Sequence, residues 1–236
     1  MNEPTICNDE GRTFYLQLVE WWREHARSFP WRETADPYAV LIAELMLRRT
    51  QARQVVPVYR DFLRRYPTVA LLAVADEDEV GERLRPLGLR WRISSFRQVA
   101  GRIVADHGGQ VPPDKDALLA LPGVGPYVAA AVLCFGYGQY AVLVDTNTVR
   151  VAGRYLGLPV HPEARRVRAV RDGIARLVPS DNPRAANLAM LDLAALVCRS
   201  RDPLCSLCPV SDGCCWRRAH RHSEDERRCE IEPRLA

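Results

Sequence analysis

The sequence predicts an all-α protein. Three observations support this class: apolar residues recur at helical spacing along most of the 236 residues, no segment alternates apolar and polar residues as a half-buried strand does, and Gly and Pro divide the chain into blocks of helical length. Hydrophobic residues make up 47% of the chain, which is enough to bury a full core.

The expected helices follow these blocks in order. The first presents Phe14 and Leu18 on one face, and the second begins after the pair Asp36-Pro37, which favours a helix start. We expect helices at 13–26, 38–51, 55–66, 69–75, 77–84, 92–106, 146–156, 163–177 and 187–198, with one more on each side of 121–125. The charged tail from residue 217 onward is expected to be frayed.

The composition limits the partners and the compartment. The 33 Lys and Arg residues exceed the 29 Asp and Glu residues by four, a balance compatible with a phosphate backbone as partner but not specific for one. No apolar run is long enough to span a membrane, and the first ten residues lack the apolar segment of a signal peptide. We therefore expect a cytoplasmic protein with no membrane partner, whose cysteines are not disulfide-bonded.

Four cysteines near the C-terminus predict a metal centre. Cys198, Cys205, Cys208 and Cys214 are separated by six, two and five residues, and thiolates at such intervals bind either zinc or an iron–sulfur cluster. The spacing alone does not separate these two metals. Cys215 is adjacent to Cys214 and is an alternative fourth ligand, whereas Cys7, Cys134 and Cys229 are interpreted as ordinary thiols.

Two short motifs indicate contacts with phosphate. Arg199 and Arg201 lie between the first two cysteines, so a metal would fix a basic loop in place. In the segment 121–125, Leu-Pro-Gly-Val-Gly, Gly123 and Gly125 leave backbone amides uncovered where the next helix begins, and such amides bind phosphate oxygens. A plain turn between two helices is the alternative interpretation of this hairpin.

Two carboxylates are candidate catalytic groups. Asp145 follows four apolar residues and precedes a helix, so it is either an N-cap or a fixed anion that stabilises a developing sugar cation. Glu44 is the only charged residue in the apolar helical segment 38–47. It is expected to be buried with a raised pKa, as suits an acid near neutral pH, or to be a structural glutamate paired with an arginine.

Arg48 and Arg49 follow at the end of the same expected helix. They would fill the gap that an extruded base leaves in a duplex, or they form a solvated basic helix end.

Taken together and in this order, these residues resemble the endonuclease III superfamily of helix-hairpin-helix DNA glycosylases, from Phe14 to Cys214. The resemblance implies a two-lobed all-α fold with a [4Fe–4S] cluster on the four cysteines, Asp145 as the catalytic aspartate and double-stranded DNA as the partner. It also implies a six-helix lobe at 33–141, and a cluster lobe formed by 1–32 and 142–236.

Tyr127 narrows the activity that the resemblance implies. Members of the family that also cleave the strand carry a lysine at this place, so the sequence is similar to the monofunctional members. The segments 29–32, 36–38 and 44–47 resemble the branch of adenine and thymine-DNA mismatch glycosylases. Arg48-Arg49 and Gly88-Leu89 are closer to the thymine enzymes, and Glu44 would then hold the edge of the flipped base with Tyr127 against its face.

The leading hypothesis is a monomeric, nucleoid-associated glycosylase of base excision repair that removes thymine or uracil opposite guanine. An adenine glycosylase acting on adenine opposite guanine or oxidised guanine is the alternative enzyme. A DNA-binding iron–sulfur protein without catalytic activity is the alternative of another class, although the presence of both Glu44 and Asp145 argues against it.

Overall fold

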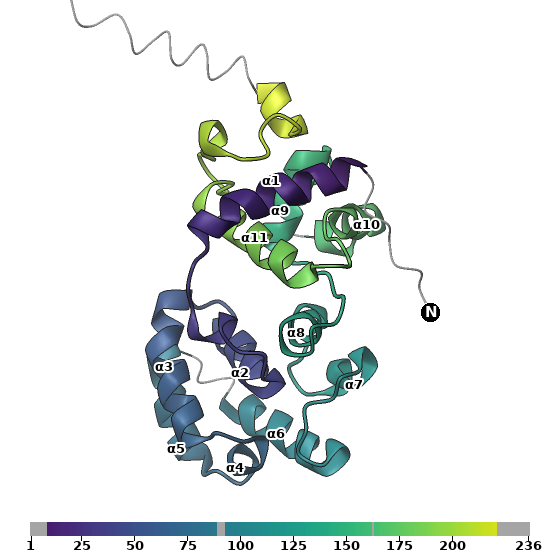
Figure 1. Cartoon of the computed structure of the whole chain (residues 1–236). Helices are drawn as coiled ribbons and strands as arrows, with labels where there is room; N and C mark the ends of the chain where they lie inside the picture. Colours follow the sequence, from purple (N-terminus) through teal and green to yellow (C-terminus); the bar gives the residue numbers. More distant parts are fainter. Residues whose placement is uncertain (1–8, 89–92, 162, 221–236) are drawn as a thin grey trace, which may run out of the picture. The chain divides into compact units, whose positions relative to one another are not determined.

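The computed structural model describes residues 9–88, 93–161 and 163–220. Within them the structure is helical and has no strand, which confirms the predicted fold class (Figure 1). The chain divides into two compact units: the hairpin unit, Arg27–Leu143, and the cysteine unit, Met1–Ala26 with Val144–Ala236. The sequence had placed these boundaries at 32/33 and 141/142. None of the described helices has the length and apolar character needed to cross a membrane.

The hairpin unit contains seven α-helices within its described residues, which is the number expected from the helical segments of the sequence, whereas the family resemblance had implied six. They are α2 (Pro37–Leu47), α3 (Ala52–Arg65), α4 (Val69–Ala73), α5 (Glu77–Leu84), α6 (Ile93–His107), α7 (Lys115–Ala120) and α8 (Pro126–Ala131), with 3-10 turns η1 (Pro30–Arg32) and η2 (Arg85–Leu87). Helix α8 continues directly into the π-helical segment η4 (Val132–Gly136).

Helix α2 forms the centre of this unit. Every residue from Tyr38 to Met46 is buried, as expected for a helix that is apolar on all sides. Asp36 caps it by accepting the backbone N–H of Tyr38 over 3.0 Å. A Cβ on Gly136 would lie 2.8 Å from the Cα of Pro37, so a glycine is needed where η4 passes the start of α2.

The end of α2 differs from the prediction. The helix stops at Leu47, four residues before the expected end at 51, and α3 starts at Ala52. Arg48 is extended and Arg49 has a φ of +61°, so the backbone turns out of the helix at these two arginines. Such left-handed backbone costs energy for a residue other than glycine and marks a place where the surroundings impose the conformation.

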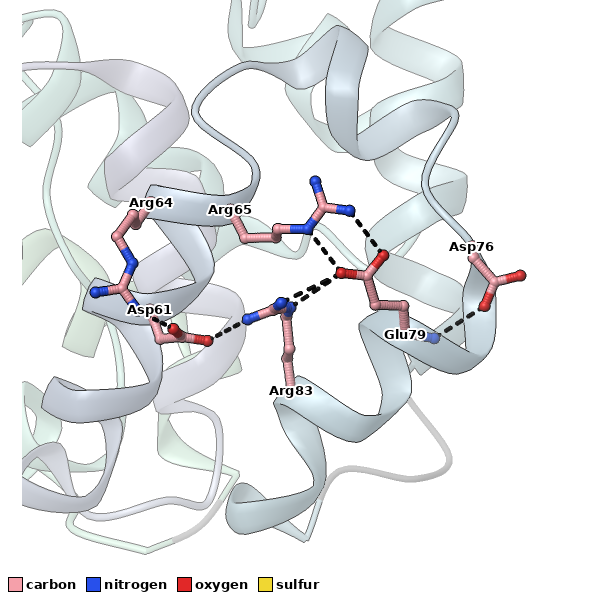
Figure 2. A network of polar contacts seen from close by, with 6 residues as sticks. All are labelled: Asp61, Arg64, Arg65, Asp76, Glu79 and Arg83. Carbon is pink, nitrogen blue, oxygen red and sulfur yellow. Dashed lines mark hydrogen bonds and ion pairs between the residues drawn. The ribbon is translucent and has the colours of Figure 1, made fainter.

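An ion-pair network joins α3 to α5 on the surface of the hairpin unit (Figure 2). Glu79 accepts two hydrogen bonds from Arg65, at 2.7 and 3.0 Å, and two more from Arg83, at 3.4 and 3.2 Å. Arg83 also pairs with Asp61 of α3. The pKa of Asp61 is lowered mainly by the hydrogen bond from Arg83. The pKa of Glu79 is lowered mainly by the hydrogen bond from Arg65.

The cysteine unit combines the first helix with the C-terminal part of the chain. Its helices are α1 (Asp9–His25), α9 (Thr146–Leu156), α10 (Arg168–Arg176) and α11 (Pro183–Leu196), with 3-10 turns η5 (Ala164–Arg166) and η6 (Cys205–Leu207). The buried carboxylate of Asp192 on α11 accepts the indole N–H of Trp22 on α1 over 2.8 Å. The ring of Phe14 packs edge-on against Tyr155 of α9. These two contacts attach α1 to the C-terminal helices.

Several predicted boundaries in this unit were wrong. Helix α11 begins at Pro183 rather than 187, because Asn182 caps it through the backbone N–H of Ala185. The expected helix 163–177 is divided into η5 and α10, since Val167 is extended. The chain is helical over 215–220, whereas a frayed tail was expected from residue 217 onward. Cys7, Leu89 and Cys229, which the sequence analysis had interpreted, lie outside the described residues.

Candidate active site and cysteine centre

Asp145 is the N-cap of α9, and its carboxylate is held by three donors. Its Oδ1 accepts the backbone N–H groups of Asn147 and Thr148, each over 2.8 Å, and its Oδ2 accepts the side-chain amide of Asn147 over 2.7 Å. The Thr148 hydroxyl in turn accepts the backbone N–H of Asp145, which completes a capping box. The capping interpretation is therefore confirmed, and it also leaves a carboxylate of fixed orientation, partly exposed, at the start of the helix.

A chain of hydrogen bonds connects Asp145 to the first cysteine. Asn147 Oδ1 accepts from Arg150 Nη2 over 3.2 Å, and Arg150 Nε donates to the backbone oxygen of Cys198 over 2.8 Å. Arg150 Nη2 also donates to the backbone oxygen of Ala194 on α11. Burial lowers the pKa of Arg150, so water solvates its charge only in part. Asn147 and Arg150 were not singled out from the sequence, although they follow Asp145 by two and five residues on the same helix.

Glu44 and Tyr127 belong to the hairpin unit. Glu44 lies in the middle of α2 and is 6% exposed, which confirms its predicted burial. Tyr127 is the second residue of α8 and is partly exposed. Both therefore lie on helices that the core of the unit holds in place.

The hairpin between α7 and α8 has the conformation that its glycines permit. Gly123 has a φ of +76°, in the left-handed region that favours glycine. Gly125 is the N-cap of α8 and has no side chain to satisfy the first amides of that helix. A Cβ on Gly125 would meet nothing within 4 Å, so the space beside this glycine is open. Such a helix start suits a phosphate oxygen.

Arg48 contacts this hairpin across a long separation in the sequence. Its Nη1 donates to the backbone oxygen of Gly123 over 3.1 Å. The exposed turn that carries Arg48 and Arg49 is thereby attached to the hairpin, so two segments predicted separately to bind DNA lie together within one unit. Arg48 and Gly123 are 75 residues apart, so no local pattern of the sequence predicts their contact.

The four predicted cysteine ligands line one cavity in the cysteine unit. Cys198, Cys205, Cys208 and Cys214 all lie in its wall, together with Arg154 and Trp216, whereas Cys215 does not. Cys215 instead accepts a hydrogen bond from Arg218 over 3.2 Å. Within the described part of the chain, no three His, Cys, Asp or Glu side chains form a site for a single metal ion. Four thiols that line one cavity are a donor set that fits a thiolate-bound metal centre.

Burial makes these thiols unfavourable as isolated anions. It raises the pKa of Cys208 to about 12, and it also raises the pKa of Cys205 and of Cys214. Neighbouring thiolates add to the shift in each case. Bound metal compensates such charges because it displaces the protons from its thiol ligands.

Arg154 shapes the basic loop between the first two cysteines. Its guanidinium donates to the backbone oxygens of Arg199 and Ser200, over 2.7 and 3.1 Å, and lies 4.9 Å from the ring centre of Trp216. Arg199 and Arg201 remain exposed on this loop. Arg154 was not singled out from the sequence, although it follows Arg150 by one helical turn on α9.

The predicted site residues thus fall into two groups. The cysteine unit carries Asp145, the cysteine ligands and the basic loop with Arg199 and Arg201. The hairpin unit carries Glu44, Arg48, Arg49, Gly123, Gly125 and Tyr127.

Known proteins share this fold and much of this sequence. The thymine-DNA glycosylase of Aeropyrum pernix is 43% identical over 88% of this chain and 96% of its own length. The adenine DNA glycosylase of Mycobacterium tuberculosis is 37% identical over 86% of this chain and 67% of its own. The solved structure of a thermostable thymine-DNA glycosylase superposes with a TM-score of 0.85 at 34% identity, covering 90% of this chain and 98% of the other.

A family match covers the middle of the chain. Residues 42–176 match the family described as HhH-GPD superfamily base excision DNA repair protein. This range includes Glu44, the hairpin and Asp145, which are the features that carried the resemblance in the sequence. The chain belongs to the HhH-GPD superfamily of base excision DNA repair proteins.

Proposed function

We propose that this chain is a monofunctional DNA glycosylase that removes thymine or uracil paired with guanine. The observation that carries the proposal is the Asp145 carboxylate, held by three hydrogen bonds at the start of α9. Breaking an N-glycosidic bond develops positive charge on the sugar. A carboxylate that is already oriented stabilises this charge without reorganising during the reaction.

Glu44 and Tyr127 are assigned to the extruded base. Thymine and uracil leave as anions when their carbonyl oxygens accept hydrogen bonds, so they need no strong acid. The buried Glu44 carboxyl group would instead bind the N–H edge of the base, with the Tyr127 ring against its face. Removal of adenine would require protonation of its ring, and Glu44 would then be the acid.

The remaining predicted residues are assigned to the DNA itself. The hairpin at Gly123 and Gly125 suits a backbone phosphate, because no side chain of its N-cap Gly125 caps the start of α8. Arg48 and Arg49, exposed on the turn after α2, suit the space that the extruded nucleotide leaves. Arg199 and Arg201 suit phosphates, because Arg154 holds the backbone of their loop.

The cysteine cavity is assigned to a [4Fe–4S] cluster. The four thiols that line it are the residues that would hold the cluster, with Cys214 rather than Cys215 as the fourth ligand. The cluster supplies a rigid structural centre that fixes the loop between Cys198 and Cys205. In this proposal Arg150 connects the same loop to Asn147 and, through it, to Asp145.

The choice of base is supported by the relatives. The alignment with this chain covers 96% of the thymine-DNA glycosylase of Aeropyrum pernix. It covers 67% of the adenine DNA glycosylase of Mycobacterium tuberculosis. The similarity to the second enzyme makes an adenine glycosylase the alternative function.

The type of reaction is tested with an end-labelled duplex that contains a G·T pair. The purified protein should release free thymine and leave an intact strand, which breaks only after alkali. Borohydride should trap no covalent adduct, because Tyr127 cannot form a Schiff base. Strand breakage without alkali, together with a trapped adduct, would show that another amine of this chain is the nucleophile and that the enzyme is bifunctional.

A further inference from the structure

A pocket of about 240 Å³ lies beside the first turns of α9, within the cysteine unit. Three of its residues, Thr146, Val149 and Arg150, come from one face of α9 at positions one, four and five of the helix. The rest of the wall comes from the segment that follows this helix. The pocket is lined by Thr146, Val149, Arg150, Val160, His161 and Arg165.

Among the described residues, the wall of this pocket contains two arginines and a histidine but neither Asp nor Glu. Neither Arg150 nor Arg165 forms an ion pair with any described residue, and the side chain of Arg165 has no hydrogen-bond partner among them. The adjacent Arg166 differs, because it pairs with Glu163 over 2.8 Å and does not line the pocket. No ion pair among the described residues therefore occupies these two guanidinium groups, and a phosphate group is the ligand that such a pair suits best.

The position of Arg150 connects this pocket to the candidate catalytic carboxylate. Arg150 donates to Asn147, and Asn147 donates to Asp145 Oδ2, so two hydrogen bonds separate the pocket wall from the carboxylate. An anion bound at Arg150 would lie close to the nucleotide on which Asp145 acts. In a DNA strand, the anion that lies next to a reacting sugar is a phosphate of the backbone.

We infer that this pocket binds a backbone phosphate of the DNA strand that contains the excised base, with Arg150 and Arg165 as its cationic ligands. The inference rests on the proposed function, because it assigns the phosphate to the glycosylase substrate. Thr146, exposed at the first position of α9, offers its hydroxyl group at the edge of the same pocket.

The test compares Arg165→Ala with Arg166→Ala, which removes the same charge one residue away but outside the pocket. Binding is measured by fluorescence anisotropy on a G·T duplex whose thymidine carries a 2′-fluorine that prevents cleavage. Arg165→Ala should weaken binding roughly tenfold at low salt. The magnitude of the slope of log K against log salt should also fall by about one, as expected for the loss of one phosphate contact. Arg166→Ala should leave both quantities close to those of the wild type. Thermal melting of all three proteins shows that the variants are folded.

Neutral methylphosphonate linkages then locate the phosphate. Placed singly along the strand, one of them should weaken binding by wild type but not weaken binding by Arg165→Ala any further, because the interaction is already lost. If every linkage affects both proteins equally while wild type still excises thymine, the pocket inference fails and the proposed function stands. If wild type neither binds this duplex nor excises thymine from the same duplex without the 2′-fluorine, both fail.

Free phosphate is the other source of this chemistry. Inorganic phosphate, added at constant ionic strength, should not raise the melting temperature of wild type more than that of Arg165→Ala. A stabilisation that depends on Arg165, without any response to the methylphosphonates, would identify a site for free phosphate and overturn the assignment to DNA.

Discussion

The side-chain amide of Asn147 donates a hydrogen bond to Oδ2 of Asp145 over 2.7 Å. This contact determines which way the carboxylate faces, because the other oxygen is occupied by the backbone amides at the start of α9. The carbonyl end of Asn147 accepts from Arg150, which in turn donates to the backbone of Cys198. Two side chains, those of Asn147 and Arg150, therefore connect the candidate catalytic carboxylate to the first residue of the cysteine centre.

We predict that Asp145→Asn loses most excision activity and keeps DNA binding. Asparagine still caps α9, so the helix should persist, but it removes the negative charge and turns an amide toward the amide of Asn147. Loss of one preorganised electrostatic partner should reduce the single-turnover rate roughly 10²–10³-fold. Binding should change little, because the ground state carries no sugar cation. A rate within tenfold of wild type, in a variant with unchanged melting, would remove Asp145 from the mechanism.

Glu44→Gln should reduce thymine excision less than Asp145→Asn does. Glutamine retains a carbonyl oxygen that can accept the N–H of a flipped pyrimidine, and it is nearly the same size in the buried centre of α2. The two variants are compared by single-turnover kinetics on the same G·T duplex. If Glu44→Gln is the more severely impaired of the two, Glu44 acts as an acid and its assignment to base binding is wrong.

We predict that substitutions of Cys205 and Cys215 have different effects on the metal content of the protein. Cys205→Ser should lose iron and the broad absorption near about 400 nm. Cys215→Ser should retain both, because Cys215 lies outside the cavity wall and contacts Arg218 instead. Iron and acid-labile sulfide are measured in anaerobically purified proteins. One zinc and no iron in the wild type would refute the cluster, and loss of iron from Cys215→Ser would reassign the fourth ligand.

The ion-pair network between α3 and α5 should stabilise the fold at neutral pH and lose this effect at acidic pH. The pKa values of Asp61 and Glu79 are lowered in the folded chain, so their contribution is present above the unfolded pKa values and is lost as the pH falls through the folded ones. The melting temperature of Glu79→Gln should therefore fall less than that of wild type between about pH 6 and pH 3. Glu82→Gln is the matched control on α5, since among the described residues Glu82 forms an ion pair with the exposed Arg85 and none with the network. Parallel curves for wild type and Glu79→Gln would contradict this role.

Local signals account for what the sequence predicted well. Helix α9 was placed at its observed bounds, because an N-cap at Asp145 and a glycine at Gly157, with a φ of +68°, mark its two ends. The end of α2 was predicted four residues too late, because the turn at Arg48, Arg49 and Thr50 contains neither the Gly nor the Pro that usually marks a helix end. This turn depends on tertiary contacts instead.

Contacts between distant segments were beyond the local pattern. Arg48 meets Gly123, and Arg150 meets the backbone of Cys198, across 75 and 48 residues. No periodicity of the intervening sequence indicates either pairing. The pocket at Arg165 was missed for the same reason, since its wall forms only when the segment after α9 folds back onto that helix.

The target base is tested most directly by the ratio of two single-turnover rates. Wild-type enzyme in excess is mixed with a duplex containing a G·T pair and, separately, with the same duplex containing adenine opposite oxidised guanine. We predict that thymine is released faster than adenine, and that Asp145→Asn slows thymine release more than Glu44→Gln does. Faster release of adenine, abolished by Glu44→Gln, would contradict the proposed function and establish the adenine glycosylase in its place.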